Sequence, residues 1–383
     1  MKNIVFIIES LYCGGAEKSL VTLLNLLDCT KFNIDLVLFK KGGEFEKLIP
    51  NSVNIKYVLP YKKTLTVFNF YFRFKFWYVK KFKLNNKHLA QIHWSVFKKE
   101  ILSLDKSYDI AIAYNQGFAT YYVASKLSSK IKYAWLNTDY KKAGYDITFD
   151  YPYYKCYNKI VCVSKESENS IKNELIRIGK ELHLAIIKDI YDVDFINKMS
   201  LVDSGLNTDK NCIKILTVGR LAKAKGYKLA IDACSILVKK EYNIKWFVIG
   251  DGPQRNEIEN LIKEKNLQEH FILLGFKENP YPYMKSCDIY VQSSLFEGLG
   301  LTVIEAAILK KPIVSTNFPT ASSIITNEET GLICEMDSIS ISNTIERYLN
   351  EDNLKIYIIK NLSLLENFDK EISLNQVNQL LNI

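Results

Sequence analysis

The chain of 383 residues has few histidines and no recognisable spacing of metal-binding side chains. It contains four histidines and eight cysteines, and no two cysteines form a C-x-x-C pair. No zinc-ligand spacing, P-loop or H-E-x-x-H motif occurs. These absences exclude the common zinc proteins and the P-loop nucleotidases. Several cysteines lie in apolar runs such as residues 160–163, so we expect reduced core side chains of a cytosolic protein.

Long apolar runs are absent as well. No segment approaches the roughly 18 uncharged apolar residues that a membrane span needs. The apolar run at the start ends at Ile8 and is followed at once by Glu9, so it is too short for a signal peptide. We therefore expect a cytoplasmic protein that is soluble, or at most peripheral to a membrane.

Acidic residues are missing from one stretch, residues 61–99. This stretch has ten Lys and Arg, no Asp or Glu, and twelve aromatic residues. The net charge is +9, and without these ten the chain has 41 basic against 42 acidic residues. Basic and aromatic residues in one segment favour an anionic membrane surface at the inner face of the cytoplasmic membrane. An ordinary core segment with a solvated edge, or single-stranded nucleic acid, stays open as an alternative.

The hydrophobic pattern alternates between strands and helices. Lys2 to Ile8 predicts a buried strand, Gly14-Gly15 a close turn and Ala16 to Leu27 a helix. The same rhythm returns at residues 33–39, 53–58, 108–114, 133–136 and 159–164. This is the pattern of an α/β protein with parallel sheets. We expect two Rossmann-like domains, residues 1–193 and 194–368, and a last helix at residues 369–383 that returns to the first domain.

The region between the domains contains a possible metal-binding pair, Asp192-Val-Asp194. No strand leads into it, so we interpret it as a surface turn in the linker rather than a metal site. The second half then repeats the alternation, with strands at residues 213–218, 245–249, 271–274, 288–292 and 312–315.

Charged side chains follow the strands of the second half. Arg220 and Lys225 follow the first of them, Asp251 the second and Glu297 the fourth. Ligands of parallel sheets bind beyond the carboxyl ends of the strands. Two fixed cations there suit a diphosphate, with Arg as a planar fork and Lys as a point charge.

Residues 295–309 place one acid in a glycine-bearing turn and a second acid in a helix. Glu297 comes just before Gly298 and Gly300, and Glu305 follows eight residues after Glu297. We expect the helix to open at Leu299, so that Glu305 lies about two turns along it. A glycine turn that leads into a helix directs free backbone N–H groups at one point. Such a turn with two acids can hold a polyol.

Taken together, these stretches resemble the family 4 glycosyltransferases, which have the GT-B fold of two facing Rossmann-like domains. The resemblance covers most of the chain and rests on Gly14-Gly-Ala-Glu17, Val161-Cys-Val-Ser164, Gly219-Arg-Leu221 with Lys225-Gly226, Gly250-Asp-Gly-Pro253, Leu274-Gly-Phe276 and Glu297 through Glu305. It implies a retaining, metal-independent transferase of hexosyltransferase type that needs no cofactor. The Gly-Gly-Ala-Glu start is similar to transferases that build bacterial capsule, the O-antigen of lipopolysaccharide or similar surface glycans.

The resemblance also implies roles for individual residues. Arg220 and Lys225 would neutralise the donor diphosphate, Glu297 would contact the transferred sugar and Glu305 would hold the ribose hydroxyls. The other donor-binding residues would be Gly15, Gly219, Asp251, Gly252, Phe276, Gly298, Leu299, Gly300 and Leu301. Many members carry a histidine on the sugar side where this chain has Asn137, which can donate a hydrogen bond but cannot titrate. Lys188-Asp189 is a second departure, because relatives often have an Asn there.

The sequence therefore predicts transfer of a sugar from a nucleotide-sugar, with UDP as the expected nucleotide, to a lipid-linked or surface-glycan acceptor. A non-catalytic membrane- or glycan-binding homologue is the alternative. A sugar-nucleotide epimerase or a glycan phosphorylase of the same fold is disfavoured by the spacing at 297–305, and no nucleic acid partner is expected.

Overall fold

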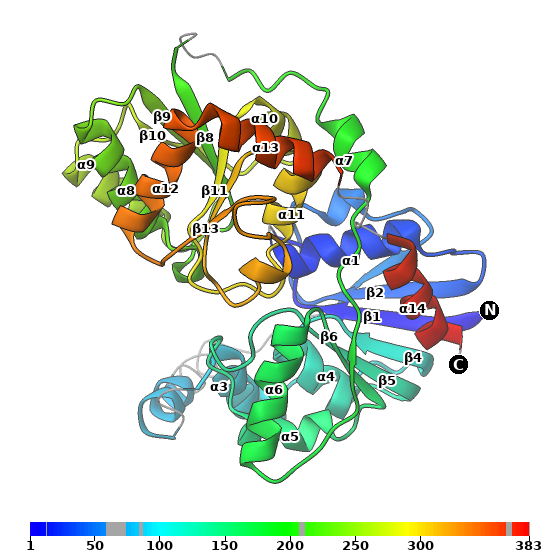
Figure 1. Ribbon diagram of the computed structural model, residues 1–383. Coiled ribbons are helices and arrows are strands. Elements are labelled where there is room, and N and C mark those ends of the chain that lie inside the picture. The colour runs from blue at the N-terminus through cyan, green and yellow to red at the C-terminus, as the bar shows by residue number, and fades with distance from the viewer. Residues whose placement is uncertain (13, 59–73, 84–86, 207–210, 365–369, 383) are drawn as a thin grey trace. The chain divides into compact units, whose positions relative to one another are not determined.

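A computed structural model describes residues 1–383 apart from 13, 59–73, 84–86, 207–210, 365–369 and 383 (Figure 1). The described chain divides into two compact units. Unit 1 contains Met1–Ile190 and Glu371–Ile383, and unit 2 contains Tyr191–Lys370. The domain boundaries predicted from the sequence were 193/194 and 368/369. Residues 61–73 and 84–86 of the basic and aromatic stretch lie outside the described residues.

Unit 1 is built on a parallel sheet with the strand order β3-β2-β1-β4-β5-β6-β7. Its strands are β1 Lys2–Ile8, β2 Phe32–Leu38, β3 Asn54–Tyr57, β4 Tyr108–Ala113, β5 Ser129–Leu136, β6 Lys159–Cys162 and β7 Leu184–Ile186. Its helical segments are α1 Gly15–Leu26, η1 Glu46–Leu48, η2 Val79–Lys83, α3 Leu89–Phe97, α4 Phe118–Lys126, α5 Ile147–Tyr154, α6 Lys165–Arg177 and α14 Lys370–Asn382. The inner strands are rich in β-branched and aromatic residues and are largely buried on both faces, as in parallel sheets, whereas the edge strands β3 and β7 are partly exposed.

Unit 2 has a parallel sheet with the order β10-β9-β8-β11-β12-β13. Its strands are β8 Ile213–Val218, β9 Ile244–Ile249, β10 Phe271–Gly275, β11 Ile289–Gln292, β12 Ile313–Thr316 and β13 Leu332–Cys334. Its helical segments are α7 Val193–Met199, η3 Lys223–Lys225, α8 Tyr227–Lys239, α9 Arg255–Glu264, α10 Tyr281–Ser286, α11 Leu301–Ile308, η4 Ala321–Ser323, α12 Ser338–Asn350 and α13 Asp352–Ser363.

Both sheets reverse their strand order at one place, between β1 and β4 in unit 1 and between β8 and β11 in unit 2. Parallel strands whose order reverses send their following loops to opposite faces of the sheet. The carboxyl ends of those two strands are therefore the ordinary place for a ligand.

The last helix returns to the first unit, as the sequence predicts. Lys2 Nζ donates to the carbonyl of Leu381 at 3.1 Å, and Tyr133 OH donates to that of Leu380 at 3.2 Å. Val377, Leu380 and Leu381 are buried. Figure 1 shows α14 beside the strands of unit 1, next to the N-terminus.

A buried carboxylate joins three helical segments of unit 1. Asp150 on α5 is fully buried and accepts hydrogen bonds from Gln91 of α3 at 2.7 Å, Tyr121 of α4 at 2.6 Å and Tyr140 at 2.6 Å. Burial raises the pKa of Asp150 to about 6, although the three donors oppose the rise. The cluster fixes α3, which belongs to the basic and aromatic stretch of residues 61–99, to the body of the unit.

Candidate active site

The charged site residues predicted for unit 2 lie near the point where the strand order of its sheet reverses, between β8 and β11. Strands β8 and β11 are direct neighbours, with Ile215 opposite Ile289. The chain leaves β8 at Gly219 and leaves β11 at Ser293, so the two loops start side by side. This is the strand-end position that the sequence predicts for Arg220, Lys225 and Glu297.

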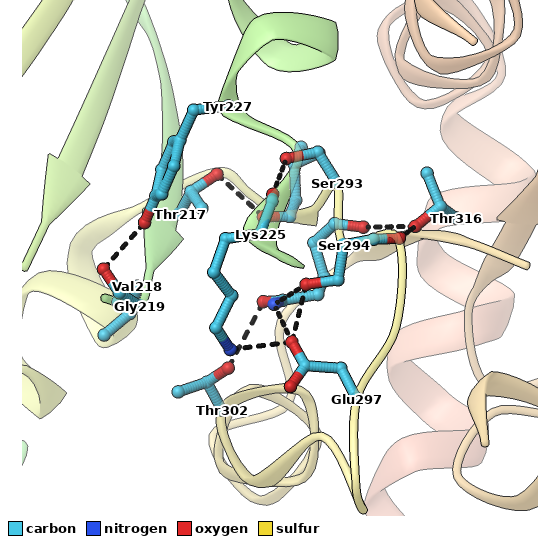
Figure 2. A network of polar contacts seen from close by, with 12 residues as sticks. Thr217, Val218, Gly219, Lys225, Tyr227, Ser293, Ser294, Glu297, Thr302 and Thr316 are labelled. Atoms are coloured by element: carbon cyan, nitrogen blue, oxygen red, sulfur yellow. Dashed lines mark hydrogen bonds and ion pairs between the residues drawn. The ribbon is translucent and has the colours of Figure 1, made fainter. Parts of the chain in front are cut away.

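The loop after β8 is closed by its own contacts. Tyr227 OH donates to the carbonyl of Gly219 at 2.7 Å (Figure 2), and Gly226 ends the turn η3 in the left-handed conformation, with φ 62°. A Cβ on Gly226 would lie 2.0 Å from the carbonyl oxygen of Ser293. Glycine at this position is therefore required both by the backbone angle and by the close approach of the second loop.

Two hydrogen bonds tie this loop to the one after β11. The backbone N–H of Leu295 donates to the carbonyl of Ala224 at 2.7 Å, and Ser293 Oγ donates to the carbonyl of Lys225 at 2.9 Å. They bring Lys225 Nζ to 2.6 Å from Glu297 Oε1. Both side chains are largely buried, with 18% and 12% of their surface exposed. The structure thus places two of the predicted catalytic residues in direct contact.

Arg220 lies on the same loop but is oriented differently. Its side chain is exposed, and within the described residues it has no hydrogen bond or ion pair. A guanidinium held at a strand end without a protein partner is suited to an incoming anion. Its role on the diphosphate stays a prediction.

The helix with the second acid starts later than the sequence indicated. Gly300 is the N-cap in the left-handed conformation, with φ 74° and ψ 48°, and α11 begins at Leu301 rather than at Leu299. Glu305 therefore lies about one turn, not two, from the start of the helix. Gly298, Leu299, Gly300 and Leu301 form the loop end and the helix start, where the first N–H groups have no acceptor within the helix.

Glu305 itself is 3% exposed. Tyr281 OH, at the start of α10, approaches its Oε1 at 3.4 Å. About one helical turn of α11 separates Glu305 from the loop that carries Glu297. Its assignment to the ribose stays a prediction.

The remaining donor residues of unit 2 follow β9 and β10. Asp251 is exposed and accepts a hydrogen bond from Gly252 N at 2.7 Å, and Gly252 is in close contact with the loop after β8, where a Cβ would lie 2.5 Å from Leu221 O. Phe276 follows β10 and is half-buried. Asp251, Gly252 and Gly219 thus lie at neighbouring strand ends, which fits a shared ligand.

Two predicted residues belong to unit 1. Gly15 begins α1, and Gly14 is its N-cap. Asn137 follows β5, where its Nδ2 donates to the carbonyl of Tyr114 and its backbone N–H donates to Gln116 Oε1 at 3.0 Å. The Asn137 amide thus connects the ends of β4 and β5. Its role on the sugar side stays a prediction.

Near Asn137, the switch point of unit 1 holds a polar group. Ser19 of α1 donates to Asp189 Oδ1, and the hydroxyls of Ser19 and Tyr114 lie 2.9 Å apart. Burial raises the pKa of Asp189 to about 6, and the hydrogen bond from Ser19 opposes the rise. The carboxyl group of Asp189 thus lies where its ionised form is costly.

The Asp192-Val-Asp194 stretch is a helix start and not a turn, which corrects the prediction. Asp192 is the N-cap of α7, and its Oδ1 accepts from Phe195 N at 3.0 Å. The sequence pattern missed this because α7 is short and lies in a polar region. In the described part of the chain, no three His, Cys, Asp or Glu side chains gather as metal ligands would.

Three polar side chains around Glu297 were not singled out by the sequence. Ser294 Oγ donates to Glu297 Oε1 at 2.5 Å, and Gln292 Nε2 donates to the same oxygen at 2.9 Å. Thr302 Oγ1 donates to Gln292 Oε1 at 3.2 Å. The available signal was the change from apolar to polar residues at 292–294, directly before the first acid.

Comparison with known proteins identifies relatives of this chain. Residues 202–363 match the family model described as "Glycosyl transferases group 1". The chain is 35% identical over 188 residues to the N-acetylgalactosamine-N,N'-diacetylbacillosaminyl-diphospho-undecaprenol 4-alpha-N-acetylgalactosaminyltransferase of Campylobacter jejuni, covering 48% of this chain and 50% of the relative. It is 24% identical over 231 residues to the UDP-Gal:alpha-D-GlcNAc-diphosphoundecaprenol alpha-1,3-galactosyltransferase of Escherichia coli, covering 56% and 59%. The chain spans about half the length of the curated relatives it matches.

Solved structures extend the likeness to the whole chain. The crystal structure of Anabaena HepE in complex with UDP-glucose matches with a TM-score of 0.75 and 17% identity, covering 100% of both chains. At this identity the likeness establishes the fold. The GT-B fold expected from the sequence is thereby confirmed.

Proposed function

We propose that this chain is a retaining glycosyltransferase of family 4 that transfers a sugar from a nucleotide donor, UDP-sugar first among the candidates, to a lipid-linked or surface-glycan acceptor. The observation that carries the proposal is the contact of Lys225 with Glu297 at the switch point of unit 2. The contact places a cation that can bind phosphate beside an acid that can accept hydrogen bonds from hydroxyls, both at the carboxyl ends of strands. The matching family model covers this region, and two relatives are named for diphospho-undecaprenol saccharides.

The diphosphate would be held by fixed positive groups. Arg220 supplies a planar pair of donors, Lys225 a point charge and the start of α11 its free N–H groups. As the bond between the anomeric carbon and the diphosphate breaks, charge develops on the leaving oxygen, and these groups are already in place for it. We propose that they do so without a metal ion.

The acids would hold the carbohydrate parts. Glu297 would accept a hydrogen bond from a hydroxyl of the transferred sugar, and Glu305 from the ribose. The acceptor hydroxyl would attack the anomeric carbon from the face that the diphosphate leaves, and its proton would pass to the leaving oxygen. Attack on that face keeps the anomeric configuration.

The acceptor side would lie against an anionic membrane. Residues 74–78 are helical and continue into η2, and Phe74, Trp77 and Tyr78 are 57%, 49% and 42% exposed. Lys80 and Lys81 are exposed on the same segment, and Lys81 Nζ lies 5.1 Å from the ring centre of Trp77. Exposed rings beside lysines suit the headgroup region. Within the described residues, no helix has the length and apolar content to cross a membrane.

The proposal is tested first by ligand binding. The purified chain is heated with UDP, GDP, ADP and CDP, and with their sugars, in buffer containing EDTA. Stabilisation by UDP that is lost in Arg220→Ala supports a metal-independent donor site. No stabilisation by any nucleotide would favour the non-catalytic homologue. NMR of the glycoside formed from an active donor then shows whether the anomeric configuration is retained.

A further inference from the structure

Gln292 is a buried amide at the centre of the polar network around Glu297. It is the last residue of β11 and is 1% exposed. A buried amide whose donors and acceptor lack hydrogen-bond partners destabilises the fold. The partners of the Gln292 carbonyl and amino groups therefore indicate its role.

The network determines which way the Gln292 amide faces. Glu297 Oε1 can only accept, so the atom of Gln292 that lies 2.9 Å away is the N–H end. The same Nε2 also donates to Ser294 Oγ at 2.7 Å. The opposite end, Oε1, accepts from Tyr290 OH at 2.8 Å and from Thr302 Oγ1 at 3.2 Å. The reversed amide would place a carbonyl oxygen against the carboxylate.

Three donors meet one oxygen of Glu297. Lys225 Nζ, Ser294 Oγ and Gln292 Nε2 all bind Oε1, at 2.6, 2.5 and 2.9 Å. Within the described residues, Oε2 accepts no hydrogen bond. Figure 2 shows Oε2 on the side of the carboxylate away from Lys225 and Ser294.

Two of the three donors are fixed by the strand and its loop. Thr316 Oγ1 donates to the carbonyl of Ser294 at 2.6 Å, which holds Ser294 in place from β12. Gln292 is held by Tyr290 and Thr302. Among the described residues, Lys225 Nζ binds only Glu297. If a phosphate attracts Lys225, Gln292 and Ser294 still hold the carboxylate.

We propose that Gln292 is a positioning residue that fixes Glu297 with Oε2 turned to the donor sugar, an inference that rests on the proposed function. The group that meets Oε2 must then donate a hydrogen bond, so it is a hydroxyl or an amide N–H of the transferred sugar and not an anionic substituent.

The contact itself is tested without any substrate. Gln292→Glu places a second carboxylate beside Glu297, which raises the pKa of the pair in the folded state. A raised folded pKa of an acid means that stability is lost as the pH rises. We therefore expect the melting temperature of Gln292→Glu, relative to the unchanged chain, to fall further at pH 8 than at pH 5.

Two controls separate this effect from a general loss of packing. Gln268→Glu makes the same chemical change at an exposed site of unit 2 and should show little pH-dependent difference. The exchanged variant Gln292→Glu with Glu297→Gln restores one acid beside one amide, so the pH dependence should disappear. An equal deficit at pH 5 and pH 8 in Gln292→Glu would overturn the contact.

The role in turnover is tested with Gln292→Met, which keeps the volume and removes the donor. UDP alone has no sugar, so its stabilisation of the chain should be unchanged. Release of UDP from the donor that stabilises the unchanged chain should fall about 10- to 100-fold at saturating donor, with little change in KM. Unchanged release would overturn the positioning role. If the unchanged chain neither binds UDP nor releases it, the proposed function fails, and the positioning role of Gln292 fails with it. The pH series still tests whether Gln292 contacts Glu297.

Discussion

Lys225 Nζ and Glu297 Oε1 lie 2.6 Å apart although 72 residues separate them in the chain. The pair joins the loop after β8 to the loop after β11. Such a largely buried pair contributes little net stability, because both charges give up water to form it. The position of the pair matters more than its stability, because a phosphate oxygen could bind Lys225 there and a sugar hydroxyl could donate to Glu297.

Glu297→Gln should abolish turnover and leave the fold intact. Gln keeps the volume and one acceptor oxygen, but it has no charge for Lys225 and a weaker acceptor for the sugar. We expect UDP release from the active donor to fall by at least about 100-fold, as for the loss of a charged contact in a transition state. Glu269→Gln, at an exposed site of the same unit, is the control. Normal release with a native circular dichroism spectrum would remove Glu297 from the site.

Arg220→Ala should weaken binding of UDP by about 10- to 100-fold, the range for a charge-assisted hydrogen bond. Because the Arg220 side chain is exposed, its removal should not change the melting temperature of the unliganded chain. Lys223→Ala is a matched control, because Lys223 is an exposed cation on the adjoining turn. Isothermal titration with UDP measures both. Equal affinities in the two variants would mean that general positive charge, and not the guanidinium, binds the diphosphate.

Gly226→Ala should destabilise unit 2 by more than its backbone angle explains. Gly226 has φ 62°, and its added Cβ would lie 2.0 Å from Ser293 O. Gly205→Ala is the control, because Gly205 has φ 65° but nothing within 4 Å of an added Cβ. The free energy of unfolding of the control should fall only by the cost of a left-handed alanine, roughly 1 kcal/mol. That of Gly226→Ala should fall distinctly more. Urea unfolding measures both variants, and equal midpoints would contradict the close approach of the two loops.

The strands of unit 2 were predictable because short apolar runs end in polar loops. Residues 213–218 were expected as a strand, and β8 is Ile213–Val218. The predicted start of α11 was wrong by two residues. Leu299 fits a helical pattern, but Gly300 beside it adopts a left-handed backbone conformation, so the helix begins at Leu301. A glycine in the sequence does not reveal which angle it takes.

The residues of the site were partly predictable and their contacts were not. A cation after β8 and an acid after β11 follow from the strand-end rule. Their contact depends on β8 and β11 being neighbours, which the chain order does not state. Gln292 was counted only as a strand residue, because the pattern cannot show that its amide faces Glu297.

Asp189→Asn should stabilise unit 1 above pH 6 and have little effect near pH 4. Burial raises the pKa of Asp189 from 3.8 to about 6 in the folded chain. An acid with a raised folded pKa costs stability once the pH passes through that interval, by up to about 3 kcal/mol for two units. The amide avoids this cost and can still accept from Ser19. Melting curves at pH 4 and 8 test this prediction beside the exposed Asp194→Asn, and a gain that does not grow with pH would contradict the raised pKa.

Neutralising Lys80 and Lys81 should weaken binding to anionic vesicles. Each lysine near such a surface contributes about 1 kcal/mol, so Lys80→Gln with Lys81→Gln should lower the vesicle partition coefficient by roughly 10- to 30-fold. The control, Lys155→Gln with Lys172→Gln, removes two exposed charges from other parts of unit 1. Sedimentation with phosphatidylglycerol vesicles at low salt measures both pairs. If both pairs bind equally, net charge alone drives binding. If Trp77→Ala also binds as the unchanged chain does, the exposed rings do not enter the headgroup region and the membrane proposal for this segment fails.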